Sequence, residues 1–215
     1  MDQVILIGAG GHAKEILGLI RDVQRVHRDF FAIQGVFADS KPQESNFSLH
    51  NIDYLGTIGD LIENSTRYLD SKYVIAIGDS DIREEIDFKL QEAGLSPLTL
   101  VHPTALIGEM VEIGEGSIIC ANAVLTTNIR IGRQSHINIG AIIHHDVIIG
   151  DFVTISPSVT VTGNCQIEKL ATVYAGATLV PGIRIGSKAK VGAGSVVTKE
   201  VAAGVTVGGS PAREL

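Results

Sequence analysis

Aliphatic residues recur at every sixth position from Val101 to Val197 without an interruption. The residue four places after each of them is small or aliphatic, as at Ala123, Ala141 and Ala177. An amphipathic helix would need apolar residues at i, i+3, i+4 and i+7, which this stretch does not sustain. A large residue alternating with a small one at a period of six is typical of hexapeptide β-helix repeats. We therefore expect a triangular coil of short parallel strands, three repeats to a turn, whose aliphatic side chains fill the interior. The recurring positions are Val101, Ile107, Ile113, Ile119, Leu125, Ile131, Ile137, Ile143, Ile149, Ile155, Val161, Ile167, Val173, Leu179, Ile185, Val191 and Val197.

The first hundred residues show a different pattern, in which short apolar runs alternate with helical stretches. Such alternation predicts an open parallel sheet with helices packed on it. The predicted strands are 4–7, 34–38, 73–77 and 97–101, the predicted helices end near 26, 64 and 93, and the polar segment 42–51 is predicted to be a loop. Asp81 is the expected cap at the start of the third helix and Gly94 its expected end.

The change of pattern divides the chain into two predicted domains, 1–98 and 99–215. We expect a small Rossmann-like parallel sheet followed by a parallel β-helix. At 215 residues the chain is long enough for both.

Composition narrows the choice of partners and compartment. The net charge is −7, with the acidic excess in the first hundred residues and a basic excess after residue 184. This balance disfavours nucleic acid as a partner and leaves room for a small phosphorylated ligand near the last turns. No apolar run approaches the roughly 18 residues of a membrane span, and no cleavable signal precedes the first strand, so a cytoplasmic location is expected. The two cysteines are predicted to be small core residues, and no metal site is expected.

The turn after the first strand is rich in glycine. Gly8-Ala9-Gly10-Gly11-His12-Ala13 lies between a strand and a helix, where free backbone N–H groups and the helix dipole favour an anion. Gly10, Asp39 and Gly78 each follow a predicted strand, and the carboxyl ends of parallel strands form one ligand-binding edge. The turn also fits the loose dinucleotide fingerprint, but Asp39 follows the glycines by nearer thirty residues than the expected twenty.

One repeat of the coil carries chemistry of its own. In Ile142-Ile143-His144-His145-Asp146-Val147, two imidazoles and a carboxylate replace the small residues found elsewhere. A neutral imidazole is suited to take a proton from an amine or hydroxyl near pH 7, and Asp146 is placed to hold the ring of His145. A surface histidine without function remains the alternative on spacing alone.

Several stretches resemble the bacterial sugar acetyltransferases of the PglD and NeuD type, members of the hexapeptide-repeat acyltransferases. The matching stretches are GAGGHAKE, AIGDSDIREEI, LVHPTALIG, INIGAIIHHDVIIGDF, VGAGSVV and GSPAR, which together extend over nearly the whole chain. The resemblance implies a left-handed β-helix, a homotrimer with active sites between subunits, and transfer of acetyl from acetyl-CoA to the amino group of a nucleotide-linked sugar.

The resemblance also assigns roles to residues. His145 is implied to be the general base, with Asp146 beside it and Asn138 in the same site. The residues implied to bind the nucleotide sugar are Gly10, Gly11, His12, Asp39, Ser40, Gly78, Asp79 and Arg83. His12 also suits a helix cap, and Arg83 suits a surface pair with Asp79 or Glu84.

The donor is implied to lie along the outside of the coil. The residues implied to hold acetyl-CoA are Thr154, Gly163, Ala175, Gly176, Ala193, Pro211 and Arg213. The chain departs from the family pattern at Thr154, where a histidine is common, and at Glu168, where a corner glycine is common, with Tyr174 following in the next turn.

Three other functions remain open at this stage. O-acetylation of a sugar, as in sialic acid modification, is the near alternative. A nucleotide-binding sensor with an inactive coil is disfavoured by the retention of His145, Asp146 and Asn138. A dehydrogenase is disfavoured because Asp39 is mis-spaced and no second catalytic domain of that kind follows.

Overall fold

The computed structural model describes residues 2–27, 31–40 and 52–215. It separates the chain into two compact units, Met1–Leu98 and Thr99–Leu215. The predicted loop 42–51 lies outside the described residues. No helix in the described ranges is long and apolar enough to cross a membrane.

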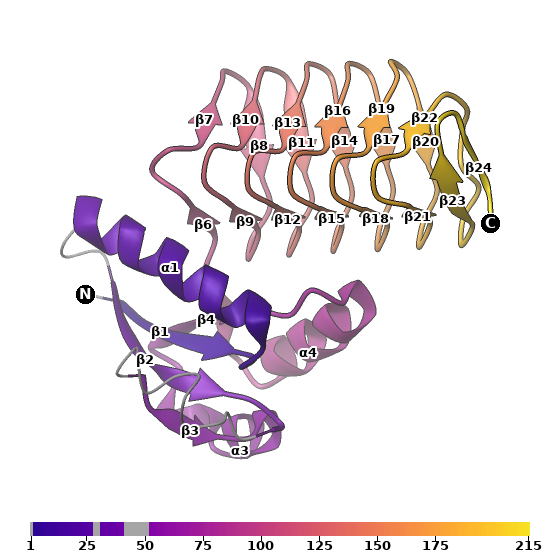
Figure 1. The fold of residues 1–215 in the computed structure, drawn as a ribbon. Coiled ribbons are helices and arrows are strands. Elements are labelled where there is room, and N and C mark those ends of the chain that lie inside the picture. Colours follow the sequence, from indigo (N-terminus) through magenta and orange to yellow (C-terminus); the bar gives the residue numbers. More distant parts are fainter. Residues whose placement is uncertain (1, 28–30, 41–51) are drawn as a thin grey trace. The chain divides into compact units, whose positions relative to one another are not determined.

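The first unit is a five-stranded parallel sheet in the order β3-β2-β1-β4-β5 (Figure 1). Its strands are β1 (Asp2–Ile7), β2 (Phe31–Phe37), β3 (Tyr54–Gly56), β4 (Ser71–Ile75) and β5 (Ser96–Pro97). Its helices are α1 (Gly11–Val26), α3 (Ile58–Glu63) and α4 (Ser80–Glu92), with a 3₁₀ turn at Ser65–Arg67. This is the predicted Rossmann-like arrangement, because β1 pairs with β2 on one side and β4 on the other.

Two expectations in this unit were wrong in detail. Strand β3 was not predicted, since its three residues are too few to show a period. The cap of α4 is Asp79 rather than Asp81, because the Asp79 side chain accepts a hydrogen bond from the N–H of Ile82 at 3.0 Å. Asp81 instead lies in the first turn of the helix. Gly94 ends the helix as predicted, with φ +83°.

The second unit is a left-handed parallel β-helix whose short strands stack into three sheets (Figure 1). The β6 face contains β6 (Leu100–Val101), β9 (Ile118–Ile119), β12 (His136–Ile137), β15 (Thr154–Ile155), β18 (Thr172–Val173), β21 (Lys190–Val191), β23 (Thr206–Gly209) and β24 (Ala212–Glu214). The β7 face contains β7 (Leu106–Ile107), β10 (Val124–Leu125), β13 (Ile142–Ile143), β16 (Thr160–Val161), β19 (Thr178–Leu179) and β22 (Val196–Val197). The β8 face contains β8 (Val111–Ile113), β11 (Ile129–Ile131), β14 (Ile148–Ile149), β17 (Gln166–Ile167) and β20 (Arg184–Ile185).

The recurring aliphatic positions fill the interior as predicted from Ile119 onward. The first turn differs, since Val101 is 36% exposed and Ile107 is 37% exposed. Within the described residues, no earlier turn of the coil covers them. The predicted strand 97–101 is also divided, because Pro97 pairs with β4 in the first unit whereas Leu100 pairs with β9 in the coil.

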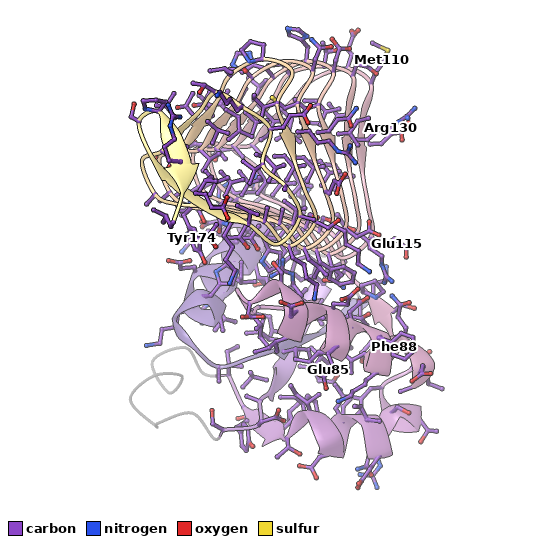
Figure 2. The ribbon with its side chains drawn as sticks, turned by 90° about the vertical axis from the view of Figure 1, so that its right-hand side faces the viewer. Glu85, Phe88, Met110, Glu115, Arg130 and Tyr174 are labelled. Carbon is purple, nitrogen blue, oxygen red and sulfur yellow. The ribbon has the colours of Figure 1, made fainter. Side chains whose placement is uncertain are left out.

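Three edges join the faces, and each turns through one residue with positive φ. We name each edge after one of these residues. The Asp146 edge, between the β7 and β8 faces, contains Met110, Asn128, Asp146, Asn164 and Gly182. The Phe152 edge contains Gly116, Gln134, Phe152, Leu170 and Lys188, and the Gly140 edge contains Asn122, Gly140, Ser158, Gly176 and Gly194. Met110 projects from the coil in Figure 2. Asn, Asp and Gly tolerate the left-handed conformation best, which accounts for much of this composition.

Candidate active site

The predicted base, His145, lies on the Asp146 edge, two residues after the end of β13. Nδ1 of His145 lies 2.7 Å from Oδ2 of Asp146. The other carboxylate oxygen, Oδ1, accepts a hydrogen bond from Nδ2 of Asn128 at 2.5 Å. An ionised carboxylate can only accept, so Nδ1 of His145 carries the proton and Nε2 keeps a free lone pair. The ring is 54% exposed and can be reached from outside.

Asp146 is held in its ionised form at this edge. Its hydrogen bond with His145, and after it the one from Asn128, keep the pKa of the carboxyl below its usual value. The partner of Nδ1 therefore stays an acceptor at neutral pH, which is the condition for a fixed imidazole tautomer.

Gly163 lies against the His145 ring on the following turn. A Cβ at Gly163 would approach Cε1 of the imidazole to 2.5 Å and Nε2 to 2.7 Å. Real side chains do not make such contacts, so only glycine leaves room for the ring in this position. Gly163 was assigned to the donor site, and its closest neighbour is the predicted base.

Asn138 does not share an edge with His145. It precedes β13, on the Gly140 edge, whereas His145 follows β13. Its side chain is buried, and Nδ2 donates to the carbonyl of Ile155 at 2.9 Å. Within one chain the two predicted site residues therefore flank the β7 face rather than meet.

The other predicted donor residues are spread over the coil. Ala175, Gly176 and Ala193 are exposed and stack on the Gly140 edge, where the N–H of Gly194 donates to the carbonyl of Ala175 at 2.9 Å. Thr154 is buried on β15, in the β6 face.

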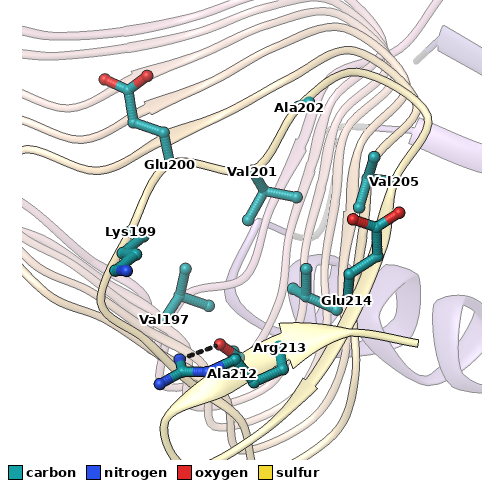
Figure 3. Close-up of a pocket in the computed structure, with 10 residues that line it drawn as sticks. Val197, Lys199, Glu200, Val201, Ala202, Val205, Ala212, Arg213 and Glu214 are labelled. Carbon is teal, nitrogen blue, oxygen red and sulfur yellow. Dashed lines mark hydrogen bonds between the residues drawn. The ribbon is translucent and has the colours of Figure 1, made fainter.

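A cavity of about 280 Å³ lies at the C-terminal end of the coil (Figure 3). Its lining combines two basic residues, Lys199 and Arg213, and two acidic residues, Glu200 and Glu214, with the apolar side chains of Val197, Val201 and Val205. Arg213 belongs to β24, where its Nη1 donates to the carbonyl of Ala212. Pro211 is not among the lining residues.

The two departures from the family pattern lie apart, since Thr154 is on β15 in the β6 face and Glu168 is on the Phe152 edge. The Glu168 carboxylate pairs with the Arg184 guanidinium, and it accepts from the N–H of Ser187 at 2.9 Å. These contacts explain a carboxylate where a glycine is common, and they lie on the Phe152 edge, away from Gly163 and Ala175. Tyr174 is exposed beside the Gly140 edge (Figure 2).

The first unit brings its predicted ligand residues to one edge of the sheet. The ends of β1, β2 and β4 are in register, with Ile7 opposite both Phe37 and Ile75. Apart from chain neighbours and, at Gly11, the backbone of α1 itself, no described atom lies within 4 Å of a Cβ built at Gly10, Gly11 or Gly78. The packing of the chain therefore does not require glycine at these positions. A ligand that approached the backbone closely would require it.

His12 lies in the first turn of α1. Burial lowers the pKa of its imidazole, the hydrogen bond and charge of Glu15 partly oppose this, and the Arg83 guanidinium lowers it further. No side chain in the described part of the chain caps this helix. The lowered pKa keeps this imidazole neutral at pH 7, beside the first N–H groups of α1. The alternative that His12 caps the helix is therefore wrong, and its place in the ligand site stays a prediction.

Asp39 and Ser40 follow β2, and Asp79 and Arg83 follow β4. Oδ1 of Asp39 accepts from the N–H of Ile58 at 3.2 Å. Arg83 is fully buried, and its Nη1 donates to the carbonyls of Ile77 at 2.8 Å and Gly78 at 3.2 Å. Burial lowers the pKa of Arg83 to about 10, so it stays charged at pH 7. The alternative that placed Arg83 on the surface is therefore wrong, although the charge of Asp79 does act on its guanidinium. The guanidinium holds the turn that presents Gly78.

Sequence reasoning missed Asn128. It lies one turn before Asp146 on the same edge, so aligning the sequence turn by turn would have placed the two side chains together. Among the described residues, no group of three His, Cys, Asp or Glu side chains could hold a metal ion.

An α/β unit with an open glycine edge, followed by a hexapeptide β-helix with an exposed His–Asp pair, defines a hexapeptide-repeat acyltransferase. A model of the PglD N-terminal domain matches residues 3–90. Over 153 residues the chain is 38% identical to GDP-perosamine N-acetyltransferase of Escherichia coli O157:H7, a match covering 69% of each chain. The chain therefore belongs to the PglD-type family of sugar N-acetyltransferases.

Solved structures of related proteins share the whole architecture. PerB from Caulobacter crescentus, in complex with CoA and GDP-perosamine, is 27% identical with a TM-score of 0.89, covering 100% of this chain and 98% of that one. WeeI from Acinetobacter baumannii AYE is 34% identical with a TM-score of 0.83, covering 100% of both chains.

Replacing Gly163 with alanine should displace the imidazole of His145 and break its hydrogen bond to Asp146. We expect kcat for acetyl transfer to fall by up to about 10²-fold, the order of loss for a misplaced catalytic group. The thermal melting temperature should stay near that of the wild type, because the exposed ring can swing outward. An unchanged kcat would show that the contact with Gly163 does not position the ring.

Proposed function

We propose that this chain transfers the acetyl group of acetyl-CoA to the amino group of a sugar carried by a nucleotide. The observation that carries the proposal is the pair of His145 and Asp146, which leaves Nε2 as a base on an exposed edge of the coil. The relatives are named for amino-sugar acceptors, which favours an amine over a hydroxyl.

In the proposed step, Nε2 of His145 takes a proton from the amine as the amine nitrogen attacks the thioester carbonyl carbon. The new C–N bond forms, the C–S bond breaks, and the sulfur leaves with the bonding electrons as the thiolate of CoA. Asp146 holds the ring and stabilises the imidazolium that the step creates. One protein base and two bound substrates are sufficient for direct transfer.

The nucleotide sugar is assigned to the carboxyl edge of the first unit. The N–H groups at Gly10 and Gly11 suit the phosphates, and the Asp39 carboxylate suits a ribose hydroxyl or a base edge. Relatives named for both GDP-linked and UDP-linked sugars make these two nucleotides the first to test.

Acetyl-CoA is assigned to the outside of the coil. Gly163 on one edge and Ala175, Gly176 and Ala193 on another offer backbone groups beside exposed surface. At the C-terminal end, Arg213 and Lys199 offer cationic groups for phosphate, with Glu200 and Glu214 in the same lining. Structures with bound CoA and acetyl-CoA exist for related proteins.

In a homotrimer, His145 of one subunit and Asn138 of another could belong to the same site. His145 and Asn138 flank the β7 face, whose outward side chains include Leu106, 59% exposed, and the exposed Ile142. Apolar side chains in a row on one face favour contact with another copy. A neighbouring subunit packed there would set its own edge beside His145.

Replacing His145 with alanine should lower kcat by about 10²–10⁴-fold, the usual cost of losing a general base. The neighbouring imidazole on the same turn offers a control, and the variant His144→Ala should retain activity. Thiol release in the presence of a GDP-linked or UDP-linked amino sugar is the measurement. Near wild-type turnover in the His145 variant would contradict the assignment.

Replacing Asp39 with asparagine should weaken the nucleotide sugar and leave acetyl-CoA unaffected. The amide keeps an oxygen for the N–H of Ile58 but loses the charge, so the turn stays formed. The KM for the sugar should rise roughly 10-fold, the loss expected for a hydrogen bond to a charged group. Calorimetric titration of each ligand separates the two affinities, and equal loss of both would place the acceptor elsewhere.

The chain should sediment as a trimer at micromolar concentration. The variant Leu106→Glu puts a charge on the β7 face and should sediment as a smaller species with little activity. Gln166→Glu makes a similar change on the exposed β8 face and serves as the matched control. A wild-type chain that sediments only as a monomer would contradict the proposal.

A further inference from the structure

The hydrogen bond from Asn128 to Asp146 is the feature that the proposed chemistry leaves unexplained. Asn128 lies one turn before Asp146, and both adopt a left-handed backbone, with φ +52° and +59°. The N–H of Asp146 donates to the carbonyl of Thr127 at 3.2 Å, so the two turns are stacked directly. The side chains therefore meet because equivalent positions of successive turns lie over one another.

The Asp146 carboxylate needs a second contact to hold one orientation. Its side chain is 44% exposed, and an exposed carboxylate paired with an exposed imidazole gains little by itself. His145 uses Oδ2 and Asn128 uses Oδ1, so the two hydrogen bonds together fix the plane of the carboxylate. A fixed carboxylate in turn fixes the ring and keeps the proton on Nδ1.

We propose that Asn128 is a positioning residue for the base, acting through Asp146 and not by contact with either substrate. This inference rests on the proposed function, since His145 is taken as the base. Asn128, Asp146 and His145 form a chain of hydrogen bonds across two turns, and Gly163 closes the other side of the ring on a third.

The other ionisable groups on these turns do not replace Asn128. Glu109 lies two turns before His145, His144 lies beside it, and Cys165 lies on the next turn with its thiol buried. The side chains that shift the pKa of Asp146 are His145 and Asn128.

The test uses two variants and a matched control in the full-length protein. Asn128→Gly removes the donor and keeps a residue suited to positive φ, and Asn128→Asp keeps size and backbone preference but replaces the N–H donor with an acceptor. Asn164→Gly is the control, because Asn164 has φ +60° on the same edge, and its side chain makes no hydrogen bond within the described part of the chain.

Both Asn128 variants should lower kcat/KM by roughly 10–100-fold, the range for losing a hydrogen bond to a charged group. The loss should fall on kcat, with the KM for each substrate little changed. The pH profile of kcat/KM should change in Asn128→Gly, because the carboxylate that holds the imidazole is displaced. Asn164→Gly should keep the wild-type profile, whatever it does to the melting temperature.

Imidazole nitrogen NMR supplies a reading that does not depend on turnover. The wild type should show a single Nδ1–H tautomer for His145, and Asn128→Gly should show a mixture. If the wild type transfers no acetyl group to any amino sugar, the proposed function fails, and the tautomer measurement still decides the role of Asn128. An unchanged tautomer and pH profile in both Asn128 variants would overturn the inference, as would equal effects of Asn128→Gly and Asn164→Gly.

Discussion

The stacking of one aliphatic side chain on the next inside the coil is the constraint on which the second unit depends. Each strand contributes a single large inward residue, and each edge contributes a small one, so successive turns pair without a shift of register. Burial of these side chains is the main source of stability, since two-residue strands have few hydrogen bonds of their own. Every outward position is thereby placed over its equivalent in the previous turn.

That stacking is also what builds the candidate site. Asn128 lies 18 residues before Asp146 in the sequence, yet the repeat brings it within hydrogen-bond distance of the carboxylate that holds His145, without a loop or a crossing segment. The site therefore costs the fold little, because Asn and Asp are already suited to the left-handed edge. Gly163 is a local adaptation to the site, because its lack of a side chain leaves room for the His145 ring.

Elements with a long sequence pattern were predicted more accurately than elements with a short one. The six-residue repeat continues for nearly a hundred residues, so it predicted the coil and nearly all of the side chains in its interior. Short elements were less predictable: β3 has three residues, and the strand expected at 97–101 divides between two sheets. The cap of α4 could not be chosen from the sequence, since Asp79 and Asp81 are both residues of a type that caps helices.

Site residues divide in a similar way. Proximity in sequence placed Asp146 beside His145, but no local pattern revealed that Asn138 lies on another edge or that Arg83 is buried under the turn at Gly78. Both facts depend on which distant segments the fold brings together, and local residue preferences carry no information about that.

The uninterrupted repeat has a consequence for how such a protein can change over evolutionary time. A single inserted residue would turn every later side chain inside out, whereas a whole added or deleted turn would leave the core intact. Between the turn of His145 and that of β22 there are three steps of about 4.8 Å each. The length of the coil can therefore change only in steps of one whole turn. Under the proposed function, the number of turns, more than any one side chain, determines how long a donor can extend from the base to Lys199 and Arg213 at the C-terminal end.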